Sequence, residues 1–274
     1  MRLLIPFITV LLFLTSCGSF NKILKSDDID YKFHKAQDYY KAEKYQYVIQ
    51  IFSPDYFPLL KGTKEFEEAF YMFAYSHYYE KDYFNAEKLF KQFSETFTNS
   101  TRALEMEYMS AYIFYKQSPK VDLEQTNTLK SIGMMQTFIN RNPEAKQVKE
   151  ATVIIEECKQ KLEQKDYKAA ELYYHMGQYR ASCVAFNNMV TNFPESNQSD
   201  YYSSKAIKAY YQFALLSIED RKIERLEEVV VDCNEFTDKY FQSKYKKEIE
   251  ELLVTANNNI KKIKNEQIKA PNGS

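Results

Sequence analysis

Glycine and proline are scarce in this sequence, and tryptophan is absent. The 274 residues include 5 glycines and 7 prolines. Tight β-hairpins favour Asn-Gly or Asp-Gly turns, and the chain has neither dipeptide before Asn272-Gly273. Sheets built from short hairpins are therefore disfavoured, and the sequence predicts an all-α fold.

An excess of one charge is also lacking, since Lys and Arg total 37 and Asp and Glu total 38. A nucleic-acid-binding domain needs a basic patch or stripe, so we predict no nucleic-acid partner. The chain has no glycine-rich phosphate loop, and its histidines, His34, His77 and His175, show no metal-binding spacing. We therefore predict no enzymatic activity, no metal and no cofactor. We interpret His77 and His175 as surface or groove residues of helices.

Four cysteines are present, and the first of them, Cys17, differs from the others in its surroundings. The remaining three, Cys158, Cys183 and Cys233, cannot all pair with one another. Free cysteines commonly behave as small buried hydrophobic residues, which is the interpretation we favour. One disulfide among the three is the alternative.

Cys17 follows a short apolar run. Arg2 precedes the run, which extends from Leu3 to Leu14 and leads into Leu14-Thr15-Ser16-Cys17. The run is shorter than the ~20 residues that a membrane-spanning helix needs, but it has the length of a signal-peptide core. The segment resembles the lipobox of bacterial lipoproteins, in which the cysteine thiol carries the lipid. We predict a signal peptide at residues 1–16 and a lipid on Cys17. A buried N-terminal helix with an incidental cysteine is the alternative.

A spacing of small and apolar residues recurs after certain tyrosines. The matching residues are Tyr83, Ala86, Phe90 and Phe93 in one segment and Tyr179, Ser182, Phe186 and Met189 in another. A small residue lies nine positions before each of these tyrosines, at Ala74 and Ala170, and a weaker copy has Ala36 before Tyr45. This pattern resembles the tetratricopeptide repeat, a hairpin of two helices.

The repeats predict a tetratricopeptide superhelix of about five helix hairpins with a C-terminal capping helix. A continuous helix is expected at about residues 148–176, because its apolar stripe contains no Pro or Gly. The predicted organisation comprises a signal peptide at 1–16, a lipidated tether at 17–30, N-terminal repeats at 31–146, a long linking helix with C-terminal repeats and capping helix at 147–264, and a disordered tail at 265–274.

Two predicted helices carry more tyrosines than one buried face requires. The tyrosines are Tyr71, Tyr75, Tyr78 and Tyr79 in one helix and Tyr108, Tyr112 and Tyr115 in the other. Tyrosine combines a large apolar area with a polar tip, so a wall of tyrosines suits an extended peptide with aromatic residues. These seven residues are our candidate peptide-binding groove. Packing between neighbouring repeats is the alternative.

Three segments resemble the BamD family, lipoprotein subunits of the bacterial outer-membrane β-barrel assembly machine. They read SPKVD at 118–122, AELYYHMGQY at 170–179 and NFPES at 192–196. The resemblance implies an outer-membrane lipoprotein that faces the periplasm and has no cofactor. Its C-terminal repeats would bind the barrel-forming subunit, and its N-terminal repeats would bind the aromatic C-terminal signals of unfolded outer-membrane proteins. A lipid-anchored scaffold for cell-envelope or secretion complexes is the alternative.

Overall fold

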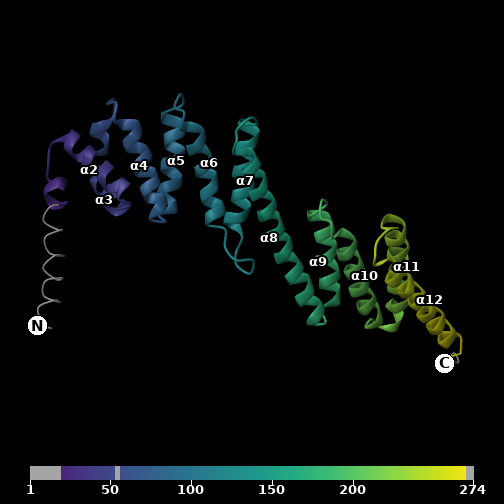
Figure 1. Ribbon diagram of the computed structural model, residues 1–274. Coiled ribbons are helices and arrows are strands. Elements are labelled where there is room, and N and C mark those ends of the chain that lie inside the picture. The colour runs from purple at the N-terminus through teal and green to yellow at the C-terminus, as the bar shows by residue number, and fades with distance from the viewer. Residues whose placement is uncertain (1–19, 53–55, 270–274) are drawn as a thin grey trace, which may run out of the picture. The chain divides into compact units, whose positions relative to one another are not determined.

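The computed structural model of the protein describes residues 20–52 and 56–269 (Figure 1). Throughout these ranges the regular structure is helical, with no strand. The all-α prediction is therefore confirmed. Cys17 and the signal peptide lie outside the described residues, so the lipid site stays a prediction.

The chain divides into two compact units. The first comprises residues 1–120 and 124–158, and the second comprises 121–123 and 159–274. The helices that begin in the first unit are α2 (Ile29–Lys41), α3 (Tyr45–Ile51), the 3-10 helix η1 (Phe57–Leu60), α4 (Phe66–Tyr79), α5 (Tyr83–Thr96), α6 (Ala103–Lys116), α7 (Thr126–Arg141) and α8 (Val148–His175). The second unit contains the end of α8 together with α9 (Tyr179–Asn192), α10 (Ser199–Leu215), α11 (Glu219–Lys239) and α12 (Lys246–Lys269).

Consecutive helices pair into hairpins, and the small residues found in the sequence lie where paired helices meet. Ala36, Ala74 and Ala170 are fully buried. In the second unit, the Ser182 hydroxyl of α9 donates a hydrogen bond of 2.9 Å to the Ala170 carbonyl of α8. A larger side chain at these positions would force the helices apart. The tandem hairpins, closed by α12 against α11, confirm the tetratricopeptide-type fold.

The turn inside three of the hairpins has one shared backbone conformation. Glu43, Lys81 and Gly177 each lie two residues before the repeat tyrosine, and their φ angles are 57°, 61° and 73°. The amide of the next residue bonds a carbonyl five positions back, as Gln178 N does with Tyr173 O at 2.9 Å. This is the Schellman ending of a helix, which favours glycine at the left-handed position. Only the third of these hairpins has glycine there.

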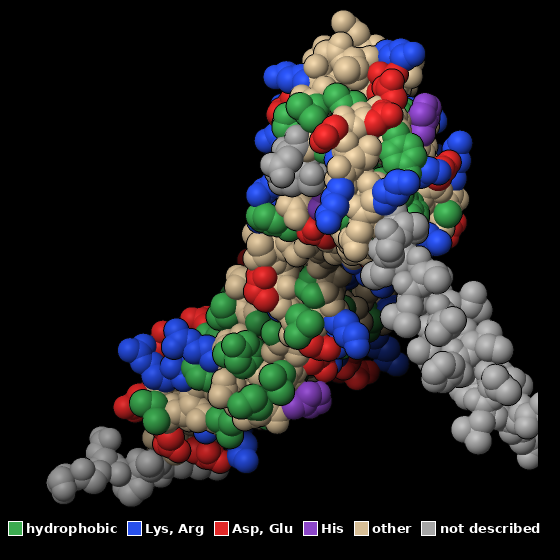
Figure 2. Space-filling view, turned by 90° about the vertical axis from the view of Figure 1, so that its left-hand side faces the viewer, with side chains coloured by type: hydrophobic (Ala, Val, Ile, Leu, Met, Phe, Trp, Pro, Cys, Tyr) green, Lys and Arg blue, Asp and Glu red, His purple; other side chains and the backbone are tan. Residues whose placement is uncertain are grey.

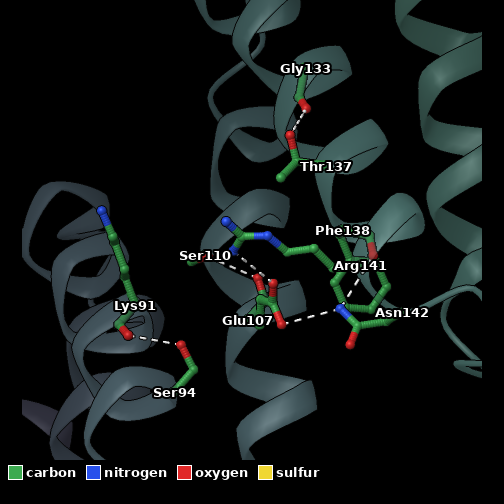
Figure 3. Close-up of polar contacts among 9 residues, drawn as sticks. All are labelled: Lys91, Ser94, Glu107, Ser110, Gly133, Thr137, Phe138, Arg141 and Asn142. Atoms are coloured by element: carbon green, nitrogen blue, oxygen red, sulfur yellow. Dashed lines mark hydrogen bonds and ion pairs between the residues drawn. The ribbon is translucent and has the colours of Figure 1, made fainter.

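A second recurring contact joins the opposite end of four hairpins, all except α2–α3, to the first helix of the same hairpin. Asn142, just after α7, donates to the Glu107 carboxylate of α6 at 3.2 Å, and Arg141 lies 3.4 Å from the same carboxylate (Figure 3). A serine makes the corresponding bond in other hairpins. These bonds are Ser100 to Glu67 at 2.6 Å, Ser196 to Glu163 at 2.5 Å and Ser243 to Asp200 at 2.7 Å. Each of these bonds therefore fixes the end of its hairpin, at the point where the chain continues into the next one.

Two of the sequence boundaries were wrong. The predicted tether at 17–30 overlaps folded structure, because residues 20–24 are helical and Phe20 and Ile23 pack into the core with Phe33. At the other end, α12 continues to Lys269 through residues assigned to a disordered tail. Apolar side chains account for the first error, since Phe20 and Ile23 lie one helical turn apart and share a face.

Candidate peptide-binding face

The seven candidate tyrosines lie on α4 and α6 of the first unit, but they differ in accessibility. Tyr75 and Tyr108 are only 7% and 6% exposed, so packing within the core is their main role. Tyr79 is 46% exposed. The others, Tyr71, Tyr78, Tyr112 and Tyr115, are half-buried. We use the name tyrosine face for the five accessible residues Tyr71, Tyr78, Tyr79, Tyr112 and Tyr115.

Tyr75 links three helices behind the tyrosine face. Its ring lies edge-on to Phe90 of α5, with 5.0 Å between centroids. Its hydroxyl donates a hydrogen bond to the Glu105 carboxylate of α6. Burial, followed by this bond and the charge of Glu105, raises the pKa of Tyr75 well above its ordinary value. The phenol therefore stays protonated and acts as a permanent donor, which supports the face from within.

On the α4 side, the tyrosine face is aromatic with one fixed cation at its border. Tyr79 stacks on Tyr45 of α3, with ring centroids 4.5 Å apart. The Arg102 guanidinium lies 4.3 Å from the Tyr71 ring centroid and pairs with Glu68 at 2.5 Å. Because Arg102 is held by both contacts, its charge is localised beside Tyr71.

On the α6 side, Tyr112 lies between Tyr108 and Tyr115, with ring centroids 5.8 Å and 5.7 Å away. The Tyr115 hydroxyl donates to Glu157 of α8 at 2.5 Å. That hydrogen bond, together with burial, raises the pKa of Tyr115 to about 12. The accessible surface therefore offers neutral rings and phenol groups, which suit apolar and aromatic side chains.

His77 is not the surface or groove residue that we expected. It is 7% exposed, its Nδ1 lies 2.8 Å from Asp82, and its ring packs edge-on against Phe73. Burial alone would raise the pKa of Asp82, but hydrogen bonds from Asn85 and His77 outweigh it and lower that pKa. The physical reason for the error is simple: His77 lies three residues after Ala74 and so shares its inward face.

Metal binding and disulfide bonding are the other chemistry to consider for the described ranges, 20–52 and 56–269. Those residues contain no group of three His, Cys, Asp or Glu side chains placed to hold a metal ion. Cys158, Cys183 and Cys233 are all buried, as their interpretation as small hydrophobic residues predicts, and Cys183 and Cys233 are free thiols. Within the same ranges no helix is both long and apolar enough to cross a membrane.

The family model described as "YfiO: Outer membrane lipoprotein" matches residues 27–226. The chain belongs to this family. The match spans both units, from just before α2 into α11. It confirms the resemblance to BamD-like outer-membrane lipoproteins that the sequence motifs indicated.

Two solved structures are similar to this chain at low identity. One is the TPR2AB domain of yeast Sti1 in a complex with pHSP90, with 13% identity, a TM-score of 0.36, and coverage of 84% of this chain and 98% of that one. The other is a kinesin light chain of Podospora anserina with nearly identical TPR-like repeats, with 10% identity, a TM-score of 0.31, and coverage of 77% and 95%. No curated protein sequence matches the chain.

Proposed function

We propose that this outer-membrane lipoprotein is a periplasmic adaptor of the β-barrel assembly machine. It aids the folding and insertion of outer-membrane proteins by binding the barrel-forming subunit and the C-terminal signals of unfolded substrates. The observation that carries the proposal is membership of the YfiO family over residues 27–226. The lipobox-like Leu14-Thr15-Ser16-Cys17 supplies the expected membrane anchor.

The tyrosine face supports peptide binding in particular. Its accessible rings lie over a well-packed interior. An aromatic side chain of a peptide can therefore stack on these rings without rearranging the hairpins. Ordering an unfolded peptide costs conformational entropy. The rigid tyrosine face adds no comparable entropic cost on the protein side. We therefore expect modest but saturable binding.

The test is a titration with a labelled peptide that ends in an aromatic residue. Replacing Tyr79 and Tyr112 together with Ser should weaken binding about tenfold or more, because two stacking surfaces are lost. The matched control is Tyr31→Ser on α2, where the side chain is 36% exposed and lies outside the tyrosine face. Equal binding by the double variant and the control would reject the tyrosine face as the site.

The second candidate function is a lipid-anchored scaffold that organises envelope or secretion complexes without touching unfolded substrates. Tandem helical repeats commonly offer extended binding surfaces, and this observation favours it. The two functions differ in ligand. A wild-type chain that shows no saturable peptide binding, and with which no barrel-forming subunit co-purifies, would support the scaffold.

The anchor is tested separately with Cys17→Ser. We expect the variant to keep its helical content and to leave the membrane fraction, since the thiol that accepts the lipid is gone. A variant that still fractionates with membranes would contradict the lipid assignment.

A further inference from the structure

The described part of the chain begins beside the turn between α2 and α3. The ring centroid of Phe20 lies 4.4 Å from that of Tyr47 and 5.7 Å from that of Tyr39. Tyr39 stands in the last turn of α2, and Tyr47 stands in the first turn of α3. These contacts hold Phe20 beside the α2–α3 turn, residues 42–44, and not at the opposite end of the hairpin.

The position of Phe20 decides which end of the first hairpin lies near the lipid. Only two residues separate Phe20 from Cys17 in the sequence, so the lipid of the proposed function is attached beside the α2–α3 turn. The inference that follows rests on that lipid anchor. Because α2 has 13 residues, the other end of the hairpin lies about 20 Å further along the helix axis. The α2–α3 turn, and not the far end of the hairpin, is therefore held near the lipid headgroups.

Three exposed lysines lie close to this point of the chain. Lys22 follows Phe20 by two residues, Lys41 is the last residue of α2, and Lys44 directly precedes α3. Within residues 20–52 and 56–269, none of the three has a carboxylate within ion-pair distance. This end of the hairpin therefore offers three ammonium groups that can bind an anion outside the protein.

Acidic groups at the same end of the hairpin do not cancel this positive charge. Asp38 of α2 is neutralised by Lys35, whose Nζ lies 2.8 Å from its carboxylate. The Glu80 carboxylate accepts a hydrogen bond of 2.8 Å from Gln46, and Glu43 is exposed in the turn itself. Figure 2 shows the side of the first unit that α2 occupies, with Lys and Arg side chains spread over it. A positive surface beside a lipid attachment point suits contact with anionic headgroups.

Two tyrosine rings complete this surface. Tyr39 and Tyr47 stack with 4.9 Å between their centroids, and both are half-buried. Tyrosine is enriched at membrane–water interfaces because its ring is apolar and its hydroxyl is polar. Lysine has a similar duality, since its aliphatic stem can lie along apolar material while the ammonium group stays in water. The residue types at this end of the hairpin therefore match the headgroup region of a bilayer.

We propose that Lys22, Tyr39, Lys41, Lys44 and Tyr47 form a membrane-contact face that binds the headgroups of anionic phospholipids. The three ammonium groups pair with lipid phosphates through charge-assisted hydrogen bonds. Three lysines supply only a weak attraction that salt reduces. The lipid on Cys17 therefore retains the chain at the bilayer, and the lysines determine which surface of the first hairpin faces it.

The test uses the lipidated chain in vesicles of phosphatidylcholine alone, or of phosphatidylcholine and phosphatidylglycerol in equal parts. Lysines are acetylated with a water-soluble reagent, and mass spectrometry gives the rate at each site. We expect Lys22, Lys41 and Lys44 to react about threefold or more slowly in the anionic vesicles, because a bound phosphate shields the ammonium group and keeps it protonated. Lys91, exposed on α5, is the control and should react equally in both. High salt should abolish the difference.

Charge reversal separates the membrane-contact face from the lipid attachment. The double variant Lys41→Glu with Lys44→Glu should remove the protection of Lys22 in the anionic vesicles. Its control is Lys88→Glu with Lys91→Glu, a lysine pair with the same spacing on α5, which should leave that protection intact. Circular dichroism should show unchanged helical content for both variants. If Lys22 stays protected without the turn lysines, its closeness to Cys17 alone brings it to the bilayer, and the proposal is wrong.

The proposal is also overturned if the three lysines react equally in the two kinds of vesicle, or if Lys91 is slowed as much as they are. Flotation of the chain with both kinds of vesicle establishes that its anchor is present, so equal reactivity in a floating chain counts against this proposal alone. A chain that floats with neither kind overturns the lipid anchor as well. The tyrosine face is unaffected by either result, because its peptide titration needs no vesicles.

Discussion

Asp232 makes the protein less stable at neutral pH than it would be with a neutral side chain there. It lies on α11, partly buried, near Cys183 and Cys233. Burial first, and then the charges of Glu235 and Glu228, raise its pKa from 3.8 to about 6. No ion pair in the described ranges involves Asp232. Its carboxylate is therefore charged at pH 7 in surroundings that favour the protonated form.

The variant Asp232→Asn removes this cost. The folded chain holds the Asp232 proton more tightly than the unfolded chain does. The wild type therefore loses stability as the pH rises from about 4 to about 6, and the variant does not. At about 1.4 kcal/mol per pH unit, the difference between the two pKa values predicts a gain of up to roughly 3 kcal/mol at pH 7. Near pH 4.5 the gain should fall to about 1 kcal/mol, because much of the wild-type carboxylate is then protonated.

The assay is guanidinium unfolding followed by circular dichroism at both pH values. The matched control is Asp238→Asn, an exposed carboxylate on the same helix, which should change the free energy of unfolding by less than about 0.5 kcal/mol. The reasoning is refuted if Asp232→Asn destabilises the protein at pH 7, or if its effect is the same at both pH values.

Three further outcomes follow from particular contacts. Burial raises the pKa of the Cys183 and Cys233 thiols to about 12, so iodoacetamide at pH 8 should label neither in the native protein and both in denaturant, as mass spectrometry can show. Ser196→Ala deletes the bond to Glu163 and should lower the free energy of unfolding by about 1–2 kcal/mol, whereas an unchanged unfolding curve would show that the bond contributes nothing. Lys81→Gly relieves a left-handed backbone position and should raise the melting temperature, with a gain of about 1 kcal/mol; a lower melting temperature would count against the turn assignment.

Much of the fold was predictable because helix hairpins leave a local signal. A small residue nine positions before a tyrosine identified the meeting point of paired helices at Ala36, Ala74 and Ala170. The uninterrupted apolar stripe likewise predicted α8 to within one residue of its observed end. These patterns depend on neighbours in the sequence, so one chain is enough to show them.

The contacts that fix the end of a hairpin to its own first helix were not predictable in the same way. Ser196 and Glu163 are 33 residues apart, and nothing in either residue's neighbourhood marks it as a partner of the other. The bond becomes recognisable only when the ends of several hairpins are compared, where a serine follows an aromatic residue by three positions, as Ser100 follows Phe97 and Ser196 follows Phe193.

The candidate site was predictable only in part. Periodicity showed that α4 and α6 have apolar residues on two faces, but it could not show which tyrosines the next helix covers. Tyr75 and Tyr108 are covered, while Tyr79 is not. The surface pocket lined by Ala181, Val184 and Phe213 was not predicted, because small residues on a helix resemble an ordinary helix face until the neighbouring helix is placed.

The burial of Phe20 also limits the distance between Cys17 and the folded part of the chain. Only Gly18 and Ser19 separate Phe20 from Cys17 in the sequence. The α-carbons of Cys17 and Phe20 can therefore be at most about 11 Å apart. With a lipid on Cys17, the first hairpin, against which Phe20 packs, would be held next to the membrane surface. The hairpin's encounters with other membrane-bound proteins would then be a search in two dimensions, at a fixed height above the acyl chains.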